Sequence, residues 1–149
     1  MNPSELRSTL ALAAIFGLRM LGLFLLLPIF SIHARGLPGG EHAFWVGLAL
    51  GIFNIVQAFF YIPLGRLSDR IGRKPVVLWG LSLFVAGALI CAAKDDLLWI
   101  AIGRGVMGAG AVSAAISAWV ADLTREQVRT RAMALVGGSI ALSFALSLV

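Results

Sequence analysis

The residues most able to do chemistry in this sequence are charged side chains that crowd one short stretch. The stretch reads Gly65-Arg66-Leu67-Ser68-Asp69-Arg70-Ile71-Gly72-Arg73-Lys74-Pro75. Asp69 is a single acceptor among four cationic donors, so we expect its carboxylate to be ionised and hydrogen-bonded. Gly65 and Gly72 are expected to let two helices turn back closely, because glycine tolerates positive φ and close approach. The pattern predicts a tight, ion-paired turn.

Two further arginines, Arg19 and Arg104, lie inside long apolar runs. A charged side chain at the centre of a bilayer costs roughly 2.5–3.5 kcal/mol on insertion scales, so each arginine needs a water-filled cavity or a partner. We interpret both as cavity residues, with snorkelling or pairing to carbonyls at helix bends as the alternative. Asn54 and Gln57 share a helix face and are further candidates for the cavity, although such amides more often bond a neighbouring helix.

The composition is that of a membrane protein. Of the 149 residues, 60% are hydrophobic and 13% are charged, and the mean hydropathy is +0.96. A soluble domain has somewhat under half apolar residues. The net charge of +5 does not indicate nucleic-acid binding, because the cations lie in short loops between apolar runs. Cys91 is the sole cysteine and lies in an apolar run, so we expect no disulfide, no metal and no cofactor.

Five apolar runs are long enough to cross a bilayer at about 20 residues per crossing. They are residues 9–32, 43–64, 75–93, 97–121 and 132–149. The expected fold is therefore all-α and membrane-spanning, with the lipid bilayer as its surroundings. Thr124 and Gln127 have the spacing of a capping box before the last run. Glycines in the second and fourth runs predict close helix packing; they are Gly47, Gly51, Gly105, Gly108 and Gly110.

The distribution of Lys and Arg predicts the orientation. Eight of them precede the first run or lie in the second and fourth loops, and two lie in the first and third loops. The positive-inside rule then places the N-terminus and the second and fourth loops in the cytoplasm. All four tryptophans fall within about one or two turns of a predicted span end, as expected for aromatic belts.

The charged stretch at residues 65–75 resembles the signature loop of the major facilitator superfamily of secondary transporters, G-x-L-x-D-R-x-G-R-[KR]. The resemblance covers the whole chain. Residues 18–22 with Pro28, and residues 122–127, are similar to the YajR-type bacterial transporters, close to the drug:proton antiporters. Residues 103–110 are similar to the helix-four motif of those antiporters, R-x-x-Q-G-x-G, and depart from it at Met107.

This resemblance implies a twelve-helix fold built from two six-helix halves. Residues 1–149 are then a partial N-terminal half with five of its six helices, and the fifth run reaches Val149 without a terminating charge or turn, so we interpret the chain as a fragment. In the superfamily the loop is a conformational latch. Its aspartate caps a helix of the other half, and its arginine pairs with an acidic residue at the end of helix four. The latch residues carried over to this sequence are Gly65, Asp69, Arg70, Gly72, Arg73, Lys74 and, as the acidic partner, Asp122.

The implied function is secondary active transport by alternating access, with proton-coupled efflux of a small organic compound as the expected activity. Arg19, Arg104, Asn54 and Gln57 are then candidates for cavity, substrate or coupling roles. No Asp or Glu lies within a predicted span, so we expect the proton carrier at Asp122, on the substrate or in the missing C-terminal half.

Two alternatives stay open. A facilitator or symporter of sugars or metabolites shares the loop signature, and a membrane scaffold without transport activity is the alternative from another class. We expect no enzyme. An intramembrane enzyme needs a nucleophile and a base within the membrane, whereas this sequence has no Gly-x-Ser-Gly motif and neither of its histidines lies within a predicted span. The expected location is the bacterial inner membrane, with several crossings and a cytoplasmic N-terminus.

Overall fold

The computed structural model describes residues 1–38, 40–110 and 112–148, and it is all-helical over these residues. The elements are α1 (Pro3–His33), the short 3-10 helix η1 (Ala34–Gly36), α2 (Ala43–Ile71), α3 (Arg73–Ala93), α4 (Leu97–Ala109), α5 (Ser113–Leu123) and α6 (Glu126–Ser147). By length and composition, 5 helical segments can cross a membrane, with α4 and α5 together forming one of them. The expected all-α class with five membrane-length helices is confirmed.

The chain divides into two compact units. Unit 1 comprises Met1–Pro28 and Ile116–Val149, and unit 2 comprises Ile29–Ala115. Unit 1 therefore holds most of α1, most of α5 and all of α6. Unit 2 holds α2, α3 and α4, and each unit is described separately below.

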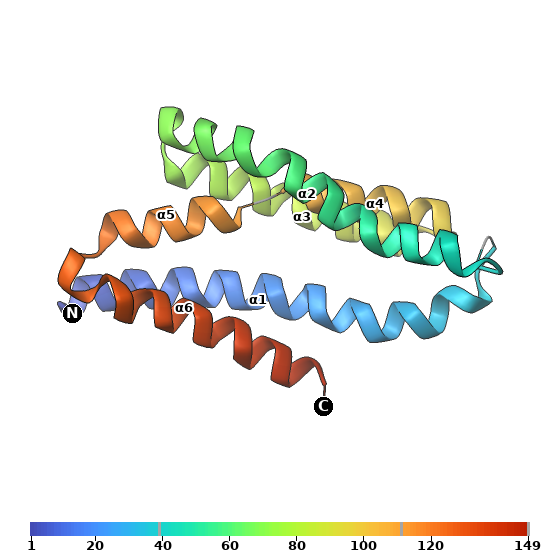
Figure 1. Cartoon of the computed structure of the whole chain (residues 1–149), viewed down its shortest axis with the longest axis horizontal. Coiled ribbons are helices and arrows are strands. Elements are labelled where there is room, and N and C mark those ends of the chain that lie inside the picture. The colour runs from blue at the N-terminus through green and yellow to red at the C-terminus, as the bar shows by residue number, and fades with distance from the viewer. Residues whose placement is uncertain (39, 111, 149) are drawn as a thin grey trace. The chain divides into compact units, whose positions relative to one another are not determined.

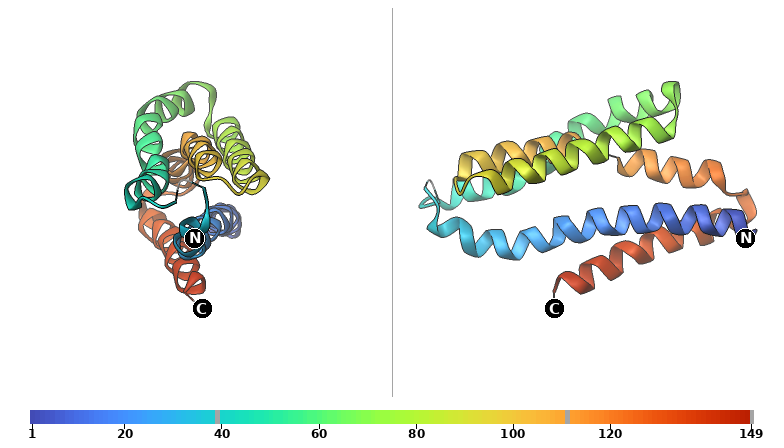
Figure 2. Two further views of the ribbon diagram at one scale, coloured as in Figure 1. Left: turned by 90° about the vertical axis from the view of Figure 1, so that its right-hand side faces the viewer. Right: turned by 180° about the vertical axis from the view of Figure 1, so that it is seen from behind.

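Unit 2 is built on the contacts of α4 with its two neighbours. Figures 1 and 2 show α2, α3 and α4 lying side by side, and α4 packs against both of the others. Glycines allow this approach, because a Cβ at Gly87 would overlap the carbonyl of Gly103, and a Cβ at Gly108 would overlap the backbone of Phe53. An apolar cluster at the Trp45 end of the unit consists of Phe30, Ala34, Leu37, Ala49, Leu97 and Ile100.

The five glycines expected to pack helices divide into two groups. Gly108 and Gly110 contact the backbones of Phe53 and Gly80, and a Cβ at Gly105 would reach a Val56 methyl at 3.9 Å. A Cβ at Gly47 or Gly51 would meet no described atom within 4 Å. The packing role of Gly47 and Gly51 therefore remains a prediction, whereas Gly108 and Gly110 lie directly against a neighbouring backbone.

This difference predicts opposite effects of the same substitution. We expect Gly108→Ala to lower the stability of the full-length protein by about 1–3 kcal/mol, because the added methyl overlaps a backbone that cannot move aside. Gly47→Ala is the matched control and should be neutral or stabilising by up to about 1 kcal/mol, since alanine favours the helix. The midpoint of thermal unfolding in detergent measures the stability of both variants. Equal midpoints for Gly108→Ala and Gly47→Ala would contradict the close packing of α2 against α4.

Unit 1 is held together by contacts between α1 and α6. The Ser143 hydroxyl donates a hydrogen bond of 2.7 Å to the carbonyl of Gly17. The rings of Phe24 and Phe144 meet edge to face with centroids 5.3 Å apart. Buried apolar side chains from α1, α5 and α6 complete the unit: Leu12, Ala13, Phe16, Ile116, Val120, Ala132 and Val136.

Several helix ends differ from the expected spans. The second helix continues to Ile71 rather than residue 64, and the last begins at Glu126 rather than residue 132. Hydropathy marks where a helix leaves hydrocarbon, and a polar helix can continue into water. The expected fourth span is two helices, since α4 ends at Ala109 with Gly110 as its C-cap. Residue 149, the expected end of the last helix, lies outside the described residues.

Candidate functional site

The charged stretch forms a corner between α2 and α3 with Gly72 as the residue between them. Gly72 has φ 98° and ψ 160°, and it is the one residue with positive φ among those described. A side chain is strained in this region, so the corner requires glycine. Gly65, in contrast, lies inside α2, and a Cβ there would meet no described atom within 4 Å. The expected turn is thus confined to Gly72, and Gly65 does not contribute to it.

Arg73 fixes the corner by reaching back onto the last turn of α2. Its Nη1 donates a hydrogen bond of 3.0 Å to the Ser68 hydroxyl and a second, very short one to Asp69 Oδ1. The Arg73 side chain is 22% exposed and that of Asp69 is 63% exposed. The expected ion pairing within the charged stretch is therefore present. Ser68, which is 1% exposed, is a member of this network that sequence reasoning did not identify.

Two other predicted latch residues, Arg70 and Lys74, form no hydrogen bond to Arg73, Ser68 or Asp69. Arg70 and Lys74 are exposed at the ends of α2 and α3. Asp122 is exposed near the end of α5 and belongs to unit 1, whereas Arg73 belongs to unit 2. The pairing of Arg73 with Asp122 remains a prediction.

Among the charged residues whose burial the structure describes, Arg104 is the least exposed, at 1%. Its Nη2 donates a hydrogen bond of 3.2 Å to the carbonyl of Leu50, and its guanidinium carbon lies 5.7 Å from the centre of the Phe53 ring. Nε and Nη1 are buried and have no hydrogen-bond partner among the described residues. The guanidinium therefore keeps two donors available for an acceptor that is not part of the described chain.

The remaining cavity candidates are Arg19, Asn54 and Gln57, and they differ in burial. Arg19 is buried in α1 within unit 1, with 4% exposed. Asn54 is exposed and Gln57 is half-buried on α2. No hydrogen bond joins either amide to another described residue, so the common structural role of such amides, bonding a neighbouring helix, is not seen here.

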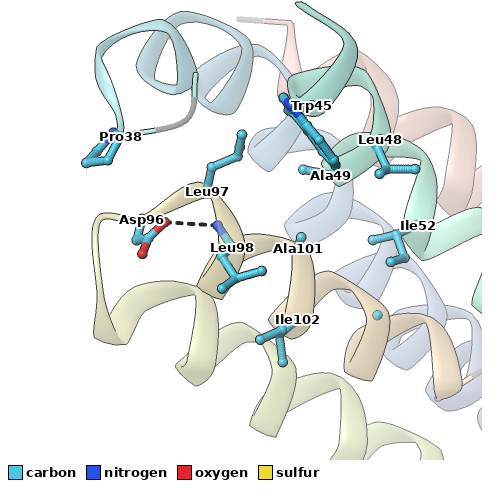
Figure 3. A pocket seen from close by; sticks show the side chains of 11 residues that line it. Pro38, Trp45, Leu48, Ala49, Ile52, Asp96, Leu97, Leu98, Ala101 and Ile102 are labelled. Atoms are coloured by element: carbon cyan, nitrogen blue, oxygen red, sulfur yellow. Dashed lines mark hydrogen bonds between the residues drawn. The ribbon is translucent and has the colours of Figure 1, made fainter. Parts of the chain in front are cut away.

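A largely apolar hollow of about 460 Å³ lies between α2 and α4, and we call it the α2–α4 hollow. Figure 3 shows its lining: Pro38, Trp45, Leu48, Ala49, Ile52, Asp96, Leu97, Leu98, Ala101 and Ile102, to which Gly105 adds. Asp96 is its one charged lining residue, and an oxygen of this side chain accepts the N–H of Leu98 at 3.0 Å as the N-cap of α4. Such a surface suits the apolar body of a small molecule.

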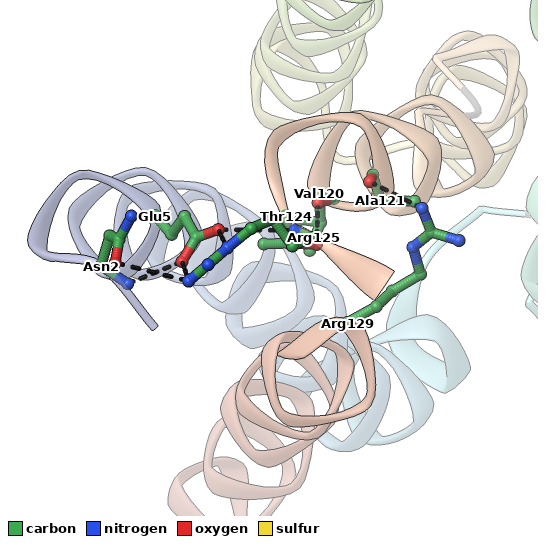
Figure 4. Close-up of polar contacts among 7 residues, drawn as sticks. All are labelled: Asn2, Glu5, Val120, Ala121, Thr124, Arg125 and Arg129. Atoms are coloured by element: carbon green, nitrogen blue, oxygen red, sulfur yellow. Dashed lines mark hydrogen bonds and ion pairs between the residues drawn. The ribbon is translucent and has the colours of Figure 1, made fainter. Parts of the chain in front are cut away.

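A second ionic network, which was not predicted, joins the two chain segments of unit 1. Figure 4 shows Arg125 facing Glu5, with Arg125 Nε donating to Glu5 Oε1 at 2.9 Å. The Asn2 backbone N–H donates to the same carboxylate at 2.6 Å. Hydrogen bonding to Glu5 raises the pKa of Arg125 above its usual value, so this guanidinium stays charged. The network fixes the start of α1 to the α5–α6 connection.

The expected capping box at the start of α6 is wrong. The Thr124 hydroxyl donates to the carbonyl of Val120 at 2.7 Å and caps no N–H of α6. Arg125 occupies the N-cap position without a side-chain hydrogen bond. The carbonyl four residues earlier in α5 competes for the threonine hydroxyl, because a hydroxyl at a helix end reaches it easily.

No group of three or more His, Cys, Asp or Glu side chains among the described residues is placed to hold a metal ion. The functional groups that the corner, Arg104 and the α2–α4 hollow present are guanidiniums, carboxylates and apolar surface. These groups bind and hold ligands or switch between ion-paired states, and they do so at the corner, at Arg104 and in the α2–α4 hollow.

Comparison with known proteins identifies relatives along the whole chain. The model of the Major Facilitator Superfamily matches residues 9–149. The inner membrane transport protein YajR of Escherichia coli (strain K12) is 47% identical over 149 residues, which are 100% of this chain and 33% of that protein. An uncharacterized transporter of Buchnera aphidicola subsp. Schizaphis graminum is 42% identical over 149 residues, 38% of its length.

A more distant relative is the class G tetracycline resistance protein of Vibrio anguillarum. It is 35% identical over 125 residues, which are 83% of this chain and 32% of that protein. The chain thus spans between 32% and 38% of the length of these relatives.

Proposed function

Because the chain belongs to the major facilitator superfamily, we propose that residues 1–149 form most of the N-terminal half of a secondary transporter that exports a small organic compound by alternating access. The observation that carries the proposal is the corner at Gly72, where Arg73 is hydrogen-bonded to Ser68 and Asp69. The 5 membrane-length segments and the match over residues 9–149 support it. We place the N-terminus and the corner on the cytoplasmic side from the charge distribution.

In this proposal the corner is the element that biases two conformations of the transporter. An exposed ion pair contributes about 0.2–1 kcal/mol, which shifts an equilibrium between two states without locking it. Asp69 is 63% exposed, so its carboxylate has a free side that can also cap a helix of the other half. A contact that is made in one state and released in the other is what alternating access requires.

Arg104 and the α2–α4 hollow supply the proposed contacts to the cargo. The two free donors of Arg104 suit an oxygen acceptor on a substrate, on the other half or on water in the cavity. The hollow, at about 460 Å³, accommodates an apolar body. These two features lie on the same pair of helices, since Arg104 contacts Leu50 of α2 and Gly105 lines the hollow.

We propose that protons drive the export, with a carrier in the remainder of the protein, at Asp122 or on the substrate. The full-length transporter in liposomes that contain a pH-sensitive dye tests this directly. Tetracycline and a panel of organic cations and anions would be added with and without a pH gradient. We expect at least one compound to move protons and to be taken up faster with the gradient. Uptake at equal rates with and without the gradient would contradict proton coupling and favour a facilitator.

A further inference from the structure

The end of α2 carries a second cationic feature that the corner does not use. Arg66 and Arg70 are exposed, and with Pro63 and Leu67 they line a hollow of about 310 Å³. Residues spaced by three and four share one face of an α-helix, so these four residues form one stripe along α2. We call it the Arg66–Arg70 hollow.

Neither guanidinium of this hollow is neutralised by the described chain. No ion pair or hydrogen bond joins Arg66 or Arg70 to any described residue, whereas Arg73 is held by Asp69 and Ser68. Like charges one helical turn apart repel each other. An anion bound between them removes this repulsion and accepts hydrogen bonds from both side chains.

The surface of α2 beside the hollow is apolar and exposed. Ile62 is 65% exposed, Leu67 42% and Ile71 55%. The apolar window of α2 is 11% buried, the smallest share among the 5 candidate spans. An anion that enters the hollow from the membrane therefore meets two guanidiniums together with a surface suited to hydrocarbon.

We propose that the Arg66–Arg70 hollow binds the phosphate diester of an anionic phospholipid. The two guanidiniums donate to the phosphate oxygens, and the acyl chains lie along the exposed apolar face of α2. Inorganic phosphate shares the anionic chemistry but lacks the acyl chains, so the two sources can be separated by experiment. This proposal takes only one point from the proposed function, namely that the hollow faces the cytoplasmic side of the membrane. Lipid binding can be measured without any transported substrate.

The test is a titration of the detergent-solubilised full-length transporter with phosphatidylglycerol, followed by native mass spectrometry. The variant is Arg66→Gln with Arg70→Gln. The matched control is Arg7→Gln with Arg131→Gln, which removes the same charge from exposed arginines that line no described hollow. Phosphatidylcholine titrations and competition by inorganic phosphate complete the set.

We expect the Arg66/Arg70 variant to bind phosphatidylglycerol more weakly by about fivefold for each arginine removed. The Arg7/Arg131 control should bind phosphatidylglycerol with the parental affinity. Phosphatidylcholine should bind the two double variants equally, and inorganic phosphate should not displace phosphatidylglycerol. An equal loss in both pairs would overturn the proposal in favour of a diffuse charge effect. Displacement by inorganic phosphate would overturn it in favour of a site for the free anion. An unchanged affinity in the Arg66/Arg70 variant would overturn it as well, because the two guanidiniums would then not contact the lipid.

Discussion

Replacing Arg104 with leucine is expected to lower transport by the full-length protein at least about tenfold while leaving it folded. A hydrogen bond to a charged group contributes about 1.5–3 kcal/mol, and Arg104 has two buried donors without a described partner. Those donors form no hydrogen bond within the described residues, and under the proposed function their acceptor is the cargo, cavity water or the other half. Initial uptake rates in proteoliposomes, with protein amounts matched, measure the loss.

The stability of the same variant separates a functional role from a structural one. A buried arginine at the centre of a helix costs roughly 2.5–3.5 kcal/mol on insertion scales, and replacing a buried charge by an apolar side chain is often neutral or stabilising. We therefore expect an unchanged or higher Tm for Arg104→Leu. Arg131→Leu is the matched control at an exposed arginine and should transport at the parental rate. A lowered Tm together with lost transport would show that Arg104 is mainly structural.

Replacing Asp69 with asparagine is expected to shift the transporter away from its outward-facing state. The substitution keeps the shape of the side chain and removes the charge that Arg73 contacts. A carboxylate at a helix N-terminus contributes about 0.3–1 kcal/mol when exposed and up to about 2 when partly buried, so the ratio of the two states should change by about 2- to 30-fold. Labelling of a cysteine in the external cavity by a maleimide that does not cross membranes measures the shift.

The control for Asp69→Asn is Asp95→Asn. Asp95 is also an exposed carboxylate, with 90% of its side chain accessible, but it lies in the α3–α4 connection rather than at the corner. Its substitution removes the same charge and should leave the labelling rate unchanged. Equal shifts for the two variants would mean that net charge, and not the corner, sets the balance between states.

Residue types alone predicted much of the corner. A lone carboxylate among cations was expected to be paired, and Asp69 is hydrogen-bonded to Arg73. A glycine was expected where two helices reverse, and Gly72 has the positive φ of that position. Ser68 was missed because it occupies a variable position of the signature, where a serine carries no signal of its own. Its role depends on the Arg73 side chain folding back over α2, and the spacing of the residues does not indicate this conformation.

Contacts between distant parts of the chain were not predictable from spacing. Glu5 and Arg125 are 120 residues apart, and the resemblance of residues 122–127 to known transporters does not indicate Glu5 as a partner. The Arg104 contact with Leu50 depends on how α2 and α4 pack together. The glycines illustrate the same limit, because Gly47 and Gly108 both lie in apolar runs, and of the two only a Cβ at Gly108 would meet another described helix.

Helix ends were predicted correctly where the helix ends at the same residue as the apolar run. The starts at Ala43 and Leu97 agree with the expected spans, and Asp96 caps the second of them. The end of α2 differs because its last two turns are polar yet remain helical. Hydropathy therefore located the membrane-length segments, whereas the extension of α2 that carries the Arg66–Arg70 hollow required the structure.

The most direct test of the corner as a conformational latch is a double-mutant cycle of Asp69→Asn and Arg73→Gln in the full-length transporter, read as the labelling rate of the external cysteine. Residues of one hydrogen-bonded network give non-additive effects. We predict that each single variant slows labelling and that the double variant slows it no further than the stronger single variant. Parental labelling rates in all three variants would contradict the latch.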